Sequence, residues 1–451
     1  MTADFDSVLG RCPLEIWITI LRLATEEAQP DSCNALVINA YDHRAASQRA
    51  EAVQNILRFT TVSKTWHAIV QPFLFQWIRL RRNARGQDPH KLGLLLQKEF
   101  DGRPRGVHVQ RLTLHMSGPE WLDKRQACIA VISQCTRLEE FECESPIMMT
   151  MRGGGHDVGA DLIRALLDTC RGSLRRVFIS GKQMHPVHLY TELLSKCPRL
   201  EHLECACWNL DGWSLQVPSL ALSVKQALWL QSFTWVTGHT AFMQFFSDLQ
   251  MPSLRKVYIS DESPSLTLEP NTLLPEVDRF FRVHGTQLLS VELSDGIWLL
   301  DHKQGMASAI LAHCPNLESF AFNLYACQPD GLVKAHDHLR RIMCYQLRLP
   351  PSSPDMDSHL KRVQDIILTL CRYRKLESIR CMDIPTSFTS SNPDELSGEG
   401  YVYRKVTQNL AAIAGSQGVR FEDRGGQHMA DGPVIPKRRE QHLGISDIFV
   451  H

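Results

Sequence analysis

The chain lacks an excess of either charge. Its 451 residues contain 49 Lys plus Arg and 49 Asp plus Glu, so the formal net charge is zero. A general nucleic-acid-binding protein usually attracts the phosphate backbone with an excess of positive charge, and this chain has no such excess. We therefore expect no nucleic-acid partner.

Long apolar runs are also missing. No stretch approaches the roughly 20 apolar residues that cross a bilayer. The first ten residues have neither the basic region nor the apolar region of a secretory signal. We therefore expect a cytoplasmic or nuclear protein with no membrane partner.

The sequence contains none of the common catalytic or metal-binding motifs. There is no G-x-x-x-x-G-K-[ST], no H-E-x-x-H, no G-x-S-x-G and no C-x-x-C. The tightest cysteine pair, Cys205 and Cys207, has no second pair to complete a four-ligand zinc site. A hydrolase would need a Ser, a His and a carboxylate that converge in a cleft, and the spacing indicates no such set. We expect a non-enzymatic protein without cofactor or metal.

What the sequence does contain is a repeated pattern around its cysteines. The 14 cysteines are dispersed, which favours reduced thiols over a disulfide scaffold. Three of them, Cys135, Cys197 and Cys314, begin segments of the form Cys-[Pro/Thr]-x-Leu that continue as apolar-x-apolar. The shared repeat frame is apolar-x-x-apolar-x-apolar, and its last three positions alternate as a half-buried strand does.

Nine copies of the repeat frame follow one another at intervals of 22 to 37 residues. They start at Leu138, Leu174, Leu200, Leu230, Leu254, Leu288, Leu317, Leu339 and Leu376. A helical stretch usually precedes the strand, and Leu410 to Phe421 indicates a last helix and strand. This period overlaps that of leucine-rich repeats. It predicts an α/β fold in which parallel strands line the concave face of an irregular solenoid and helices line the convex face. The alternative is an ordinary α/β domain with coincidental cysteines.

The residues before the repeats predict a small helical module. One amphipathic helix begins near Pro13, and a second apolar run at helical spacing ends at Pro72, which we expect to break it. The second run consists of Ile56, Phe59, Ser63, Trp66 and Val70.

This module resembles the F-box. Cys12-Pro-Leu-Glu-Ile16, Val62-Ser-Lys-Thr-Trp66 and Phe75-Gln-Trp77 follow the order Leu-Pro-x-Glu-Ile, Val-Ser-x-x-Trp and Leu-x-Trp of that family. Cys12 stands where the family has Leu, and the segment before Val62 is longer than in compact F-boxes. Together with the repeats, the chain resembles the fungal F-box proteins that carry irregular leucine-rich repeats.

The resemblance implies a substrate-recognition subunit of an SCF-type ubiquitin ligase. In this family the F-box binds a Skp adaptor, which connects to a cullin scaffold, and the repeats bind a protein substrate. The adaptor-binding residues that it implies are Pro13, Leu14, Ile16, Val62, Ser63 and Trp66. The alternative is a repeat scaffold or inhibitor with no ubiquitin role, in which Trp17, Trp66 and Trp77 form the private core of a helical cap.

The resulting division of the chain has four parts. Residues 9–80 form the F-box-like module, 81–106 a linker, 107–425 the leucine-rich-repeat-like solenoid and 426–451 a disordered tail. Strand alternation directs every second side chain outward. Aromatic and arginine side chains dominate binding energetics, so the strands suggest six candidates for substrate binding. These are Arg176, Phe178, Lys256, Tyr258, Arg341 and Tyr345.

Overall fold

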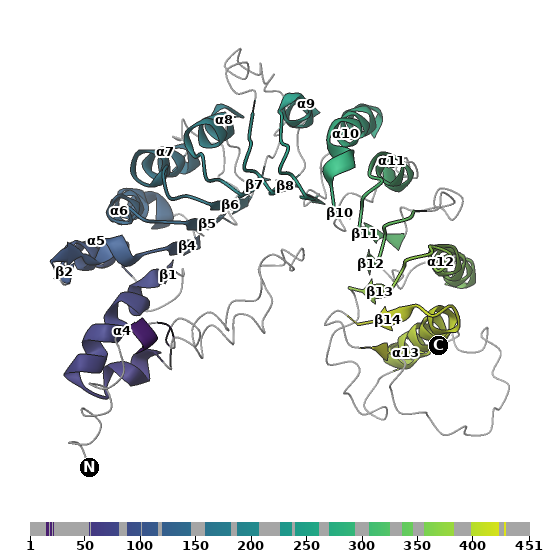
Figure 1. Ribbon diagram of the computed structural model, residues 1–451, viewed down its shortest axis with the longest axis horizontal. Coiled ribbons are helices and arrows are strands. Elements are labelled where there is room, and N and C mark those ends of the chain that lie inside the picture. The colour runs from purple at the N-terminus through teal and green to yellow at the C-terminus, as the bar shows by residue number, and fades with distance from the viewer. Residues whose placement is uncertain are drawn as a thin grey trace. The chain divides into compact units, whose positions relative to one another are not determined.

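Figure 1 shows a computed structural model of the chain. The residues that it describes are 15–17, 19, 21, 54, 56–80, 88–100, 102–115, 120–145, 158–181, 187–206, 226–236, 240–260, 270–293, 306–324, 336–345, 356–382, 398–423 and 428–429. The chain divides into two compact units, Met1–Leu317 and Glu318–His451, and each is described by itself.

The first unit is built on a parallel sheet whose strands lie side by side in chain order. Its described strands are β1 (Trp77–Leu80), β4 (Arg111–His115), β5 (Glu140–Ser145), β6 (Arg176–Gly181), β7 (His202–Ala206), β8 (Ser232–Val236), β9 (Lys256–Ser260) and β10 (Ser290–Leu293). The register is constant, because Phe141, Val177 and Leu203 are direct partners across β5, β6 and β7. A small antiparallel pair, β2 (Glu99–Phe100) with β3 (Arg103–Pro104), stands apart from this sheet.

Helices connect most of these strands. They are α4 (Lys64–Gln76), α5 (Pro89–Gln97), α6 (Glu120–Gln134), α7 (Val158–Cys170), α8 (Val187–Lys196), α9 (Thr240–Asp248), α10 (Pro270–His284) and α11 (Met306–His313), with short 3-10 turns η1 (Arg105–His108) and η3 (Gly285–Gln287). Figure 1 shows α5 to α10 on one side of the strands. The described crossover helices between neighbouring parallel strands therefore cover that side of the sheet, and the side chains that alternate with the buried ones point to its other face.

The second unit repeats the same plan with four described strands. β11 (Ser319–Asn323), β12 (Arg341–Tyr345), β13 (Ser378–Cys381) and β14 (Arg420–Glu422) are parallel and lie in chain order. α12 (Met356–Leu370) follows β12 and α13 (Gly398–Ser416) follows β13.

These strands confirm the α/β class and the repeated helix–strand unit. Each of the nine predicted repeat frames ends in a strand, from β5 to β13, and the predicted closing helix and strand are α13 and β14. Two further strands carry the same frame: Val109, Leu112 and Leu114 lead into β4, and Phe75, Ile78 and Leu80 into β1. The parallel stacking within each unit is typical of repeat solenoids.

The core of the first unit consists of columns of equivalent side chains from successive repeats. Cys135 and Cys170 form part of one column, where the Cys170 thiol lies 3.1 Å from the carbonyl oxygen of Cys135. Burial raises the pKa of Cys170 to about 12, and the cysteines whose side chains the structure describes are free thiols. They therefore serve as small apolar residues with a weak donor.

Two predicted boundaries are wrong. Pro72 lies inside α4, which continues to Gln76. A turn at residues 61–62, followed by the N-cap Ser63, instead divides the predicted run. The predicted linker 81–106 contains α5, which packs against α6, so its described part belongs to the repeat array. In the predicted tail, His428 forms an antiparallel bridge with Glu422 and Met429 is buried, while the rest lies outside the described residues.

Candidate interaction surfaces

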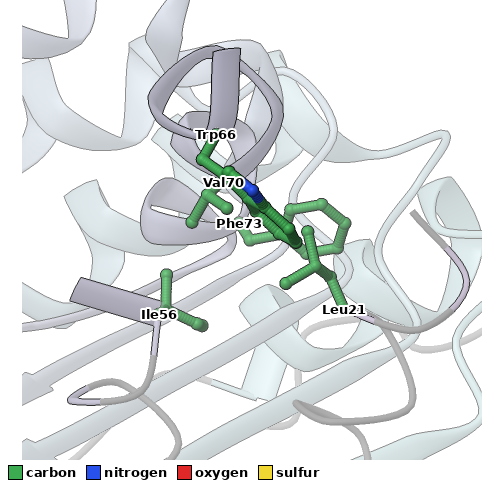
Figure 2. Close-up of a cluster of buried hydrophobic side chains, with 5 residues drawn as sticks. All are labelled: Leu21, Ile56, Trp66, Val70 and Phe73. Atoms are coloured by element: carbon green, nitrogen blue, oxygen red, sulfur yellow. The ribbon is translucent and has the colours of Figure 1, made fainter. Parts of the chain in front are cut away.

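The N-terminal module is held together by one aromatic cluster. Trp66 packs edge-on against Trp17, with ring centroids 5.0 Å apart, and stacks on Phe59 at 5.2 Å. Figure 2 shows the side chains of the buried cluster, Leu21, Ile56, Trp66, Val70 and Phe73. Aromatic pairs of this geometry add to the stability that burial alone provides.

The structure separates the predicted adaptor-binding residues into two groups. Ile16 and Val62 are exposed, at 48% and 52%. Trp66 is only 5% exposed, so its predicted presentation to a partner together with Ile16 and Val62 is wrong. The cause is that its indole fills the space between Trp17 and Phe59.

The other predicted residues of this set have different positions. Ser63 is half-buried, and its hydroxyl oxygen accepts a hydrogen bond from the Trp66 backbone N–H at 3.2 Å, which caps α4. Pro13 and Leu14 lie outside the described residues. Leu57, which sequence reasoning missed, is 49% exposed. The available signal was its place next to Ile56 in the second apolar run, off the buried face.

The helical module continues directly into the sheet. α4 ends at Gln76 and β1 begins at Trp77, where the half-buried indole belongs to the strand and not to a private core of the module. The Gln110 backbone N–H donates to the Gln76 carbonyl at 2.9 Å, and the Arg105 guanidinium lies 5.5 Å from the centre of the Phe75 ring. The module is therefore fixed to the first repeats of its unit.

The outward face of the first sheet carries a row of polar side chains. Register places Arg111, Glu140, Arg176, His202, Ser232 and Lys256 on successive strands. Glu140 lies between two arginines, 3.2 Å from Arg111 Nε and 3.1 Å from Arg176 Nη1. Arg176 is thus already engaged by a carboxylate on its own sheet.

A second row lies two residues further along each strand. It contains Thr113, Glu142, Phe178, Glu204, Thr234 and Tyr258. The Thr113 hydroxyl donates to Glu142 at 2.9 Å. Phe178 and Tyr258, predicted as exposed substrate contacts, are half-buried and three strands apart, which corresponds to roughly 14 Å at the usual strand spacing. They do not form one compact site.

In the second unit only one of the two predicted substrate contacts faces solvent. Arg341 is exposed, whereas Tyr345 is 9% exposed, and its expected role as an exposed aromatic anchor is wrong. β12 is buried from Ile342 to Tyr345 on both faces, so alternation did not distinguish inside from outside there.

One Ser–His pair is close enough to resemble a catalytic nucleophile and its general base. His202 Nδ1 lies 2.5 Å from Ser232 Oγ, and Nε2 lies 4.0 Å from Glu201. Burial, with Arg176 and Lys256 nearby, lowers the pKa of His202 to about 4. A general base must accept a proton, and these cations oppose the imidazolium that would result. The pair is therefore a structural hydrogen bond.

Among the described residues, no three His, Cys, Asp or Glu side chains come together as metal ligands. Within the same part of the chain, every helix is too short or too polar to cross a bilayer. No model of a known protein family matches this chain, and none of the curated proteins matches it.

Proposed function

We propose that the chain is the substrate-recognition subunit of an SCF-type ubiquitin ligase. The helical module, as an F-box, would bind the Skp adaptor and through it the cullin scaffold, and the repeats would bind a protein substrate. The observation that carries this proposal is the exposure of Ile16 and Val62 on a module whose aromatic core is already filled.

Ile16 and Val62 are aliphatic side chains that the module leaves in solvent. Trp66, Val70 and Phe73 complete the core without Ile16 or Val62, so neither exposed side chain is needed to fold the module. Fully burying such a side chain stabilises by about 1.5–3 kcal/mol, a gain that binding to a partner would supply. An apolar groove in an adaptor is the kind of surface that accepts exposed apolar side chains presented by a helical module.

The attachment of the module to the sheet also suits a substrate receptor. Because α4 runs directly into β1, the described part of the module joins the first repeats without an intervening linker. A substrate held on these repeats would therefore be connected to the adaptor through a short path along the chain. The ubiquitin transfer itself would be done by the assembled ligase.

A second candidate function is a repeat scaffold or inhibitor with a helical cap and no ubiquitin role. The burial of Trp66 against Trp17 favours it, because this implied adaptor contact is instead part of the module's own core. Solenoids require such caps at their ends.

The test is co-expression of the full chain with a Skp adaptor, followed by size-exclusion chromatography. We expect the wild type to co-elute with the adaptor and Val62→Asp to elute alone. Leu94→Asp is the matched control, because Leu94 is an aliphatic residue on α5 that is at least as exposed as Val62. Circular dichroism shows whether each variant is folded. If the folded wild type elutes without the adaptor at micromolar concentration, the ligase function is contradicted and the repeat scaffold is the favoured function.

A further inference from the structure

The turn before β8 exposes two large apolar side chains. Leu228 is 46% exposed and Trp229 is 62% exposed, although the residues on either side, Ala227 and Leu230, are buried. This turn lies at the edge of the sheet where the strands begin. Indoles are usually buried over most of their surface, so an adjacent exposed pair is a candidate contact surface.

The register of the sheet shows what surrounds Trp229. His202, Ser232 and Lys256 are direct partners on β7, β8 and β9, so the turn residues three positions earlier are Arg199, Trp229 and Ser253. Backbone hydrogen bonds continue into the turns, from Gln231 N–H to Glu201 at 2.7 Å and from Arg255 N–H to Gln231 at 2.8 Å. Neighbouring turns therefore keep the strand spacing of about 4.8 Å, which places Arg199 beside Trp229.

Arginines occupy the same edge in the three repeats that precede this turn. Arg137, Arg171 and Arg199 are exposed, and none of them forms an ion pair with a described residue. The guanidinium of the exposed Arg255 is held by the carbonyl oxygens of Pro252 and Leu254, at 2.9 and 3.0 Å, with no carboxylate against it.

Acidic side chains do not offset this charge. Two half-buried glutamates, Glu139 and Glu201, lie in the equivalent turns, and Glu201 is bound by Arg175 at 2.7 Å. The described part of this edge is therefore positive in a chain of zero net charge. A positive edge around an exposed indole complements an acidic ligand that carries an apolar group.

We propose that this arginine–tryptophan edge binds an acidic peptide segment of a protein partner, with one apolar residue of the segment packed on the indole. The edge consists of Arg137, Arg171, Arg199, Leu228, Trp229 and Arg255. Arginine and tryptophan are the residues that most often dominate binding energy, and guanidinium groups bind carboxylates in a bidentate manner. Single-stranded nucleic acid fits less well, because it requires several stacking platforms along one groove and this edge offers one exposed ring.

The test uses the full chain and a phage-displayed library of random peptides. We expect the enriched peptides to be rich in Asp and Glu around an aromatic or aliphatic residue. One enriched peptide, labelled with fluorescein, is then titrated by fluorescence polarisation. Trp229→Ser and Arg199→Glu should each raise its Kd on the order of tenfold or more. Both side chains are exposed, so both variants should fold, as circular dichroism would show.

The controls are Leu94→Ser and Arg103→Glu, which change an exposed aliphatic residue and an exposed arginine elsewhere in the same unit. Their Kd should equal that of the wild type. Enrichment of no peptide or of neutral or basic peptides, an unchanged Kd in either edge variant, or tighter binding of a labelled single-stranded oligonucleotide would overturn the proposal. The assay contains no adaptor, so its outcome is independent of the ligase function proposed above.

Discussion

Trp66 lies between Trp17 and Phe59 and contributes a large apolar surface to a core of few residues. Replacing it with alanine should destabilise the module by about 3–5 kcal/mol, because the variant loses buried apolar surface and also leaves a cavity in the core. Urea unfolding followed by circular dichroism measures this change.

Val62→Asp is the matched comparison for Trp66→Ala. Val62 is about half exposed in the turn before α4, so its replacement should change the free energy of unfolding by only about 0.5 kcal/mol. Equal destabilisation by the two variants would contradict the assignment of Trp66 to the core and of Val62 to the surface.

His202 makes stability depend on pH at the residue scale. Burial and the nearby Arg176 and Lys256 lower its pKa to about 4 in the folded chain, whereas the unfolded chain protonates it near pH 6.5. Its contribution to stability is therefore complete above about pH 6.5 and is lost as the pH falls toward 4. Linkage gives a loss on the order of 2 kcal/mol between about pH 7 and pH 5.

The measurement is thermal or urea unfolding of the wild type and of His202→Asn across this pH range. Asn keeps a hydrogen-bonding side chain near Ser232 but does not titrate, so the pH dependence should be shallower in the variant. His284, whose pKa is lowered mainly by burial, adds a second contribution of the same sign and remains in both proteins. The same slope in both proteins would show that His202 does not carry this effect.

At the element scale, two glycines let successive repeats approach closely. A Cβ added to Gly106 in η1 would lie 2.3 Å from the carbonyl oxygen of Gln134, and one added to Gly285 in η3 would lie 2.3 Å from that of His313. Both carbonyls are at the end of the helix of the following repeat, immediately before Cys135 and Cys314. The same contact thus recurs at two places in the array.

Gly285→Ala should destabilise the first unit by about 2 kcal/mol or more, because the obstructing atoms are backbone and cannot rotate away. Gly172→Ala is the control, since Gly172 lies in the equivalent turn after α7 and an added Cβ meets nothing within 4 Å. Urea unfolding measures the stability of both variants. Similar unfolding midpoints for Gly285→Ala and Gly172→Ala would contradict the close packing at Gly285.

Strands were predicted correctly from the sequence where the repeat frame was recognised. The repeat frame located β5 to β13, because each strand needs an alternating buried pair after a buried leucine at the turn. β1 and β4 carry the same frame without a Cys-x-x-Leu start and were missed. The predicted helix end at Pro72 was wrong, because α4 continues through this proline and loses only the hydrogen bond that its missing N–H would donate.

At the scale of the whole molecule, the chain consists of two compact units, and buried thiols are present in both. Burial raises the pKa of Cys128 and Cys197 to about 12 and that of Cys371 to about 11. Because thiolates are the reactive form, the described cysteines should resist iodoacetamide in the folded protein.

Pulsed alkylation in increasing urea, read by mass spectrometry, should label Cys135, Cys170 and Cys197 together. Cys344, Cys371 and Cys381 of the second unit should be labelled at a different urea concentration. The reason is that stacked repeats are stabilised chiefly by their neighbours, so a chain of this size need not unfold in one step. A single midpoint for all six cysteines would contradict this expectation.

The side-chain pattern along the chain was enough to predict the repeating helix–strand unit, since burying one apolar face against the next repeat requires the same side-chain spacing each time. The same pattern could not predict which large apolar side chains are exposed in the folded chain. Trp66 and Tyr345 became buried and Trp229 stayed in solvent, because these outcomes depend on neighbours brought together by folding. The arginine–tryptophan edge likewise exists only through register, which aligns turns that are about 30 residues apart in the chain.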